Sequence, residues 1–126
     1  MSHKIVKTMA APSPIGPYNQ AIWAGDLLFV SGQIALHPHT GELLTEDLRV
    51  ETHQVMQNIQ AILAEAGLEF HHVVKATIYL LDMSFFSTVN EVYGSYFTSQ
   101  APARETVQVA GLPKNVNVEI SMIACR

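Results

Sequence analysis

Apolar residues recur at intervals of three and four positions in two stretches of the chain, and this spacing predicts two helices. The first helix is expected from about Asp47 to Ala66, with Gly67 as the residue that ends it. The second is expected to begin at Asp82 or Ser84, since either residue can cap a helix. The apolar stripe of the first helix is Leu48, Thr52, Val55, Met56, Ile59, Ile62, Leu63 and Ala66, and that of the second is Phe85/Phe86, Val89, Val92/Tyr93 and Tyr96/Phe97.

Shorter stretches rich in β-branched and aromatic residues predict strands. They are expected at 4–7, at 21–23 and 27–30 as a hairpin around Gly25, at 73–81, and twice near the C-terminus. This order predicts a single α+β domain over residues 1–126, with a mostly antiparallel sheet and two helices packed on one face. Two helices leave the other face of the sheet uncovered, and self-association is expected to cover it.

The last two strands are expected to form a hairpin around a turn at Gly111–Lys114. In that register Thr106 lies opposite Glu119, and Arg104 lies diagonally from Glu119 on the same polar face. A guanidinium can bind a carboxylate through two parallel hydrogen bonds, and a carboxylate can activate water. Arg104 and Glu119 are therefore candidate catalytic residues. The simpler alternatives are a solvated surface charge at Arg104 and a structural ion pair at Glu119.

The composition of the chain limits which binding partners and which cellular compartment are expected. Apolar residues make up 48% of the chain and charged residues only 14%, which fits a protein that hides further surface in an oligomer. The net charge of −4 and the scattered basic residues argue against nucleic acid as the main partner. The single cysteine, Cys125, excludes an internal disulfide and fits a reducing compartment. No apolar run approaches the roughly 20 residues that span a bilayer, so a cytoplasmic protein is expected.

Metal and cofactor sites are not expected. His37 and His39, and the adjacent His71 and His72, lack the spacing of metal ligands on a helix and have no cysteine partner. No phosphate-binding loop, dinucleotide fingerprint or ordered Ser/His/Asp set is present. Reactions that depend on those motifs have no support in the sequence.

Six short motifs, taken in order, give the chain a family resemblance. They are Ile15–Ala21, Val30–Ile34, Val89–Tyr93, Pro102–Arg104, Leu112–Lys114 and Val118–Ile120. The chain thus resembles the RidA family, also called YjgF/YER057c/UK114, over nearly its whole length. The resemblance implies a chorismate-mutase-like fold and a homotrimer with clefts between subunits.

The resemblance also implies which residues line the pocket. Tyr18, Ser31, Gly32 and Asn90 match the family's pocket positions, and Thr106 stands where many members have cysteine. On the residues alone, Tyr18 also fits a surface aromatic, Ser31 a turn residue and Asn90 a polar residue on a helix surface. In RidA-like proteins the glutamate that matches Glu119 holds and polarises a water near the substrate.

The activity implied is hydrolysis of reactive 2-enamino and 2-imino acids, released by pyridoxal-phosphate-dependent serine and threonine dehydratases, to 2-oxo acids and ammonia. That is the reaction of a 2-iminobutanoate/2-iminopropanoate deaminase, and it needs no cofactor. A non-catalytic module that binds a 2-oxo acid is an alternative. Ribonuclease activity or translation inhibition, ascribed to some relatives, is a weaker one because the chain is acidic.

Two positions depart from the family pattern. Glu105 occupies a place where a small residue is usual, and alternation is expected to turn it away from the site, toward the helix side or a partner. The loop Thr98–Ala101 is shorter than is typical and lacks the usual aromatic residue before Pro102. Substrate range is therefore less certain than reaction type.

Overall fold

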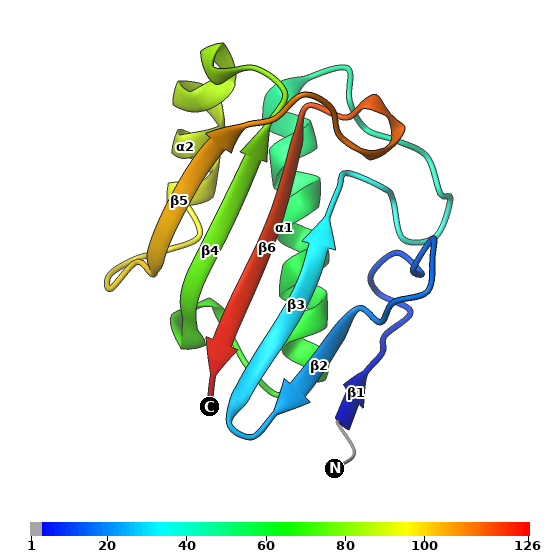
Figure 1. Cartoon of the computed structure of the whole chain (residues 1–126), viewed down its shortest axis with the longest axis vertical. Coiled ribbons are helices and arrows are strands. Elements are labelled where there is room, and N and C mark those ends of the chain that lie inside the picture. Colours follow the sequence, from blue (N-terminus) through cyan, green and yellow to red (C-terminus); the bar gives the residue numbers. More distant parts are fainter. Residues whose placement is uncertain (1–3) are drawn as a thin grey trace.

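The computed structural model describes residues 4–126 as a six-stranded sheet with both helices on one face (Figure 1). The strand order is β1-β2-β3-β6-β4-β5, and only the β4–β5 pair is parallel. This confirms the predicted fold class. The strands are β1 Lys4–Val6, β2 Ala21–Ala24, β3 Leu27–Gln33, β4 Val73–Leu80, β5 Ala103–Gln108 and β6 Val118–Cys125, and the helices are α1 Leu48–Glu65 and α2 Phe86–Gly94.

The helix α1 follows the predicted stripe closely. Asp47 caps its first turn, because the carboxylate accepts hydrogen bonds from the backbone N–H of Arg49 (2.8 Å) and Val50 (3.1 Å). Gly67 follows the helix with a φ of 77°, a conformation that glycine adopts without steric cost. The stripe from Val55 to Leu63 packs against the sheet and belongs to the main hydrophobic core, to which the strands contribute most of the other buried side chains. In the part of the chain that the structure describes, no helix is long and apolar enough to cross a bilayer.

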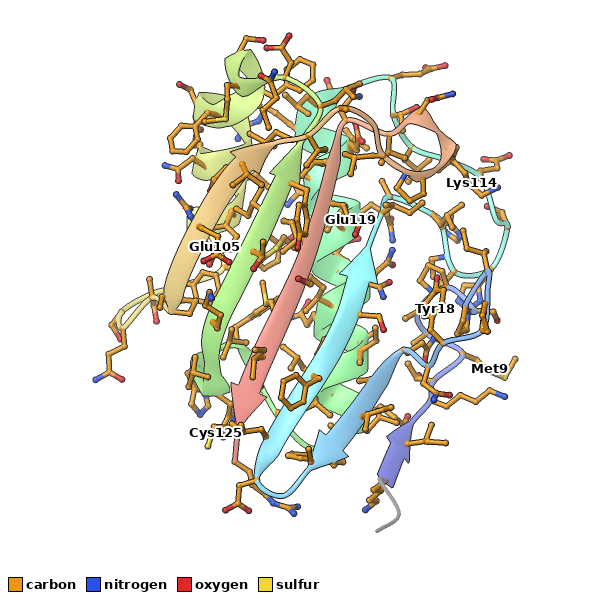
Figure 2. The ribbon with its side chains drawn as sticks, in the orientation of Figure 1. Met9, Tyr18, Glu105, Lys114, Glu119 and Cys125 are labelled. Atoms are coloured by element: carbon orange, nitrogen blue, oxygen red, sulfur yellow. The ribbon has the colours of Figure 1, made fainter. Side chains whose placement is uncertain are left out.

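The strands β6 and β4 lie at the centre of the sheet. The side chains of β6 alternate between the two faces along the whole strand, and those of β4 do so after a register shift between Val73 and Lys75. Val118, Ile120 and Met122 are buried beneath the helices, while Glu119 and Ser121 point to the opposite face. Among residues 4–126 no helix or strand covers that opposite face, which we call the open face (Figure 2). It carries partly exposed apolar side chains, among them Leu27, Phe29 and Val107.

The predicted C-terminal hairpin is wrong. β5 pairs in parallel with β4 at the edge of the sheet, and β6 runs between β3 and β4 (Figure 1). Parallel neighbours need a crossover connection, and α2 supplies it between β4 and β5. The connection 109–117 then passes over the end of β4, where Leu81 N–H donates to the carbonyl of Asn117 (3.0 Å). It is longer than the roughly two to five residues of most hairpin loops.

A buried carboxylate ties α1 to the start of β6. Glu51 is fully buried, and its two oxygens accept hydrogen bonds from the backbone N–H (2.8 Å) and the side-chain amide (2.7 Å) of Asn117. Burial raises the pKa of Glu51, and the hydrogen bonds from Asn117 partly offset that effect. Asn117 lies two residues before Glu119, so this contact fixes the beginning of the strand that carries Glu119.

Removing the buried Glu51 carboxylate leaves two partly buried donors of Asn117 without this acceptor and creates a cavity. We expect Glu51→Ala to lower the free energy of unfolding by about 3–5 kcal/mol. Glu51→Gln keeps an acceptor for the backbone N–H and should cost less. Urea unfolding at fixed protein concentration measures both, with Glu65→Ala, an exposed position on the same helix, as the control. Equal midpoints for Glu51→Ala and Glu65→Ala would contradict the role given to this contact.

Candidate functional site

Glu119 projects from β6 onto the open face beside a bulge in β3. The register between β3 and β6 shifts between Val30 and Gln33, which leaves Ser31 and Gly32 as the irregular residues. The carboxyl group of Glu119 lies directly over Gly32: a Cβ at that position would overlap Oε2 and lie 2.9 Å from the carboxyl carbon. Glycine is therefore required here by the close approach of Glu119.

The Glu119 carboxyl group has no neighbour that compensates its charge. Within residues 4–126 no hydrogen bond or ion pair reaches it, and partial burial raises its pKa. A carboxyl group with a raised pKa that faces a pocket is suited to exchange protons with a bound ligand or water.

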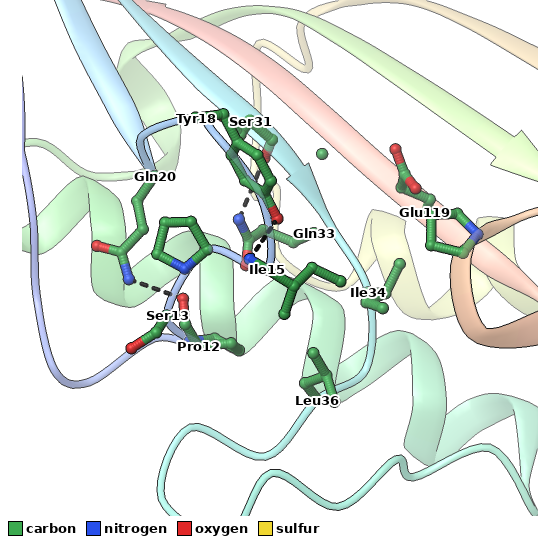
Figure 3. A pocket seen from close by; sticks show the side chains of 13 residues that line it. Pro12, Ser13, Ile15, Tyr18, Gln20, Ser31, Gln33, Ile34, Leu36 and Glu119 are labelled. Carbon is green, nitrogen blue, oxygen red and sulfur yellow. Dashed lines mark hydrogen bonds between the residues drawn. The ribbon is translucent and has the colours of Figure 1, made fainter.

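The pocket at Glu119 has a volume of about 330 Å3 and opens between the N-terminal loop and the end of β3 (Figure 3). Three predicted pocket residues, Tyr18, Ser31 and Gly32, line it together with Glu119. The Tyr18 hydroxyl accepts from the backbone N–H of Ile15 (3.3 Å), which leaves its own hydrogen free for a ligand. The Ser31 hydroxyl donates to the carbonyl of Asn19 (2.6 Å), so its oxygen can accept from a ligand.

The other three predicted site residues lie together elsewhere, on the helix face near α2. The Arg104 guanidinium donates to Asn90 Oδ1 (2.8 Å) and packs against the rings of Phe86 (5.7 Å) and Tyr93 (5.1 Å). These contacts hold the guanidinium in one place while leaving most of its donors free. Thr106, which pairs with buried Ile78, shares this face.

Two buried hydroxyls accompany Arg104. Thr106 Oγ1 and Tyr93 Oη are both buried and find no hydrogen-bond partner among the described residues. Burial raises the pKa of Tyr93, and Arg104 partly offsets this effect. Sequence reasoning assigned Tyr93 to the core and missed its contact with Arg104. The spacing of three residues between Asn90 and Tyr93 on one helix could have indicated it.

The predicted placement of Arg104 and Glu119 on one face is wrong. Arg104 pairs with Ala76 of β4, and Ala76 pairs with Met122 of β6, which is buried beneath the helices, so Arg104 lies on the helix face. Glu119 is separated from Met122 by an odd number of positions on β6, so its side chain points to the open face. The sheet thus separates the two side chains within one chain. Thr106 does not lie opposite Glu119 either, because Glu119 pairs with Tyr79 of β4.

Glu105 points to the open face and not to the helix side. Its carboxylate accepts from the Thr77 hydroxyl (2.5 Å) and forms an ion pair with Lys75 (3.2 Å), and these contacts lower its pKa. Both partners belong to β4, so Glu105 does not compete for Arg104 within the chain.

The residues Thr98–Gln100 of the short loop border a separate hollow, and the Glu119 pocket lies elsewhere. No group of three or more metal-ligating side chains occurs in the described range.

Comparison with known proteins gives one consistent result. Residues 8–126 match the family model described as Endoribonuclease L-PSP. The chain is 50% identical over 121 residues to a RutC family protein of Pyrococcus horikoshii, with 96% of each chain covered. It is 46% identical over 121 residues to the chloroplastic Reactive Intermediate Deaminase A of Arabidopsis thaliana, covering 96% of this chain and 65% of that protein.

Solved structures agree with the sequence comparison. A protein of the conserved Rid family from Yersinia pestis superposes with a TM-score of 0.96 at 43% identity, covering 99% of this chain and 100% of that one. TdcF of E. coli, solved with bound serine, superposes with a TM-score of 0.93 at 41% identity, covering 98% of both chains. The matched residues include every predicted site position from Tyr18 to Glu119. The chain therefore belongs to the RidA (YjgF/YER057c/UK114) family.

Proposed function

We propose that the protein is a cytosolic hydrolase that converts 2-enamino and 2-imino acids to 2-oxo acids and ammonia. The observation that carries this proposal is Glu119, an uncompensated carboxyl group with a raised pKa that lines a pocket. Relatedness to a Reactive Intermediate Deaminase A supports a deaminase in general. We propose more narrowly that its substrates are 2-iminobutanoate and 2-iminopropanoate formed by pyridoxal-phosphate-dependent dehydratases.

We further propose that each active site combines two subunits of a homotrimer. Arg104 and Glu119 lie on opposite faces of one sheet, so one small ligand cannot touch both within a single chain. The open face carries Glu119 and the exposed apolar side chains of Leu27, Phe29 and Val107, and apolar surface of this kind favours association. A ring of subunits lets the open face of one meet the Arg104 side of the next.

The two subunits that form each proposed site would supply different parts of the chemistry. Arg104 of the next subunit would bind the carboxylate of the imino acid, with Asn90 fixing the guanidinium and the Thr106 hydroxyl available as a further donor. This places the C=N carbon beside Glu119, and Tyr18 and Ser31 would hold the ligand through their hydroxyl groups.

The reaction then follows as proton transfer and addition of water. Glu119 takes a proton from water as the oxygen attacks the carbon of the protonated imine, and the C=N double bond becomes a single bond. The carboxylic acid returns that proton to nitrogen, and the C–N bond breaks to release ammonia. The hydroxyl proton passes to the Glu119 carboxylate as C=O forms and from there to ammonia, which becomes ammonium. The balance is one iminium acid and one water consumed, one 2-oxo acid and one ammonium ion released. A protonated imine is already electrophilic, so the protein's part is to orient it and to move protons.

Ribonuclease activity is a second candidate because the matching family model bears that description. A nucleic-acid interface needs a continuous track of basic side chains. Here Arg49, Lys75 and Arg126 are ion-paired with acidic residues. The remaining described basic residues are spread over the chain, which weakens this candidate.

A coupled assay tests the proposed reaction. A threonine dehydratase supplies the imine, semicarbazide traps what is not hydrolysed, and 2-oxobutanoate release is followed with and without the protein. We expect acceleration, with kcat/KM reduced about a hundredfold or more in Arg104→Ala and in Glu119→Gln. The controls are Arg49→Ala and Glu65→Gln, which change exposed residues of α1 away from the pocket.

Other outcomes of this assay decide between the alternatives. Binding of 2-oxobutanoate without any acceleration would identify a non-catalytic binding module. Cleavage of RNA that survives Arg104→Ala would support the ribonuclease and contradict the deaminase.

Gly32 offers a test of the geometry at Glu119. In Gly32→Ala the new methyl group overlaps the Glu119 carboxyl group, so that side chain must move away from the pocket. We expect kcat/KM to fall about tenfold or more, because small displacements of a catalytic group are costly. The control is Gly111→Ala, where an added methyl group meets nothing within 4 Å. Equal activity of the two variants would show that the position of Glu119 in this structure is not the active one.

A further inference from the structure

A second hollow lies apart from the Glu119 pocket, where the C-terminal half of α1 meets the segment that follows α2. Its volume is about 380 Å3, and it is lined by Gln60 and Ala64 of α1 together with residues 68–71 and 96–100. No residue lines both this hollow and the Glu119 pocket. The hollow is therefore a separate cavity, and the proposed deamination does not use it.

Three aromatic rings stand at steep angles to one another in the wall of this hollow. Phe70 lies edge to face with Tyr96 (ring centroids 5.4 Å apart, interplanar angle 61°) and with Phe97 (5.5 Å, 68°). The Tyr96 hydroxyl is hydrogen-bonded to His53 Nδ1 of α1 (2.8 Å). Phe97 packs in addition on the ring of Tyr93 (4.9 Å). These contacts fix the rings in advance, so a ligand need not order them on binding.

The charge around this hollow is negative. Glu69 is the one carboxylate among the lining residues, and they include no lysine or arginine. The only basic side chain in the lining is His71, whose Nδ1 lies 3.9 Å from Glu69 Oε2. Ala64 belongs to the last turn of α1, where the helix dipole is negative and no basic residue compensates it. The hollow therefore attracts cations and repels anions.

Aromatic faces beside a carboxylate favour an organic cation. The face of an aromatic ring carries partial negative charge, so it attracts an ammonium group while its carbon atoms pack against the methyl or methylene groups of that cation. A metal ion fits less well, because Ca²⁺ and Mg²⁺ need several oxygen ligands and Glu69 is the only carboxylate in the lining. The lining thus matches a cation with an apolar body.

We propose that this hollow is a second binding site, selective for a small organic ammonium cation such as a trimethylammonium group. The methyl groups of the ligand lie against Phe70, Tyr96 and Phe97, and its charge faces Glu69 and the C-terminal end of α1. All of these groups belong to one subunit. The site therefore goes beyond the proposed deaminase and does not depend on it.

Choline and its uncharged carbon analogue, 3,3-dimethylbutan-1-ol, test the selectivity for charge, because the two molecules have nearly the same shape. Saturation-transfer NMR titrations of the full-length protein, without any imine present, measure the Kd of each. We expect a Kd on the order of 1 mM for choline. The Kd of the uncharged analogue should be at least about fivefold higher, because it has no attraction to the ring faces beyond apolar packing.

Ala64→Lys places a competing ammonium group at the hollow. Ala64 is exposed and lysine is a good helix former, so the fold is retained, and we expect choline binding to weaken about tenfold or more. Gln57→Lys is the matched control, since it adds the same charge at an exposed position of α1 that does not line the hollow. Glu69→Gln should weaken binding about threefold, because this carboxylate is exposed, and Glu42→Gln should leave it unchanged.

Four results would overturn the inference. Equal Kd values for choline and its uncharged analogue would show that the hollow does not select a cation. Unchanged choline binding in Ala64→Lys, or loss of choline binding in Glu119→Gln, would place the cation at another site. No saturable binding at choline concentrations about tenfold above the expected Kd would remove the site altogether. Each of these results leaves the proposed deaminase standing, because the titrations contain no imine.

Discussion

Successive side chains of a β-strand point to opposite faces of its sheet, and this rule separates the two charged groups on which the proposed chemistry depends. Glu119 belongs to the open face, and Arg104 belongs to the helix face one strand beyond β4. No rotamer brings them together through the sheet. The Glu119 pocket lacks a cation among its lining residues, and the Arg104 cluster has two buried hydroxyls without partners. The proposed interface between subunits would bring these two groups together.

The position of Glu119 is unfavourable for the fold and is maintained by its surroundings. Partial burial raises its pKa, and among residues 4–126 no partner compensates its charge; perturbed carboxyl groups of this kind are common at functional sites. The bulge with Gly32 makes room for the carboxyl group, and the buried Glu51 fixes the strand from which it projects. These supports come from β3 and α1, so the geometry of one side chain depends on most of the core.

The local pattern of apolar residues predicted the helices and strands well, but it did not predict the order of the last strands in the sheet. The stripe from Leu48 to Ala66 and the run from Val73 to Leu81 correspond closely to α1 and β4, because amphipathic spacing records burial directly. The C-terminal hairpin failed because adjacency in sequence favoured pairing of neighbours, whereas α2 allows a parallel crossover and β6 inserts between β3 and β4. That single error placed Arg104 and Glu119 on one face. Tyr93 was missed for a different reason: the apolar stripe records only its burial, and its contact with Arg104 is indicated only by its spacing of three residues from Asn90 on the same helix.

The claim that one site needs two chains can be tested by mixing two inactive variants. Arg104→Ala keeps Glu119, and Glu119→Gln keeps Arg104, so a mixed trimer contains some interfaces with both wild-type groups. With equal amounts co-expressed and assembled at random, about one quarter of the sites are complete, and we expect about a quarter of wild-type deaminase activity. Activity no greater than that of the two variants measured separately would contradict a site shared between subunits.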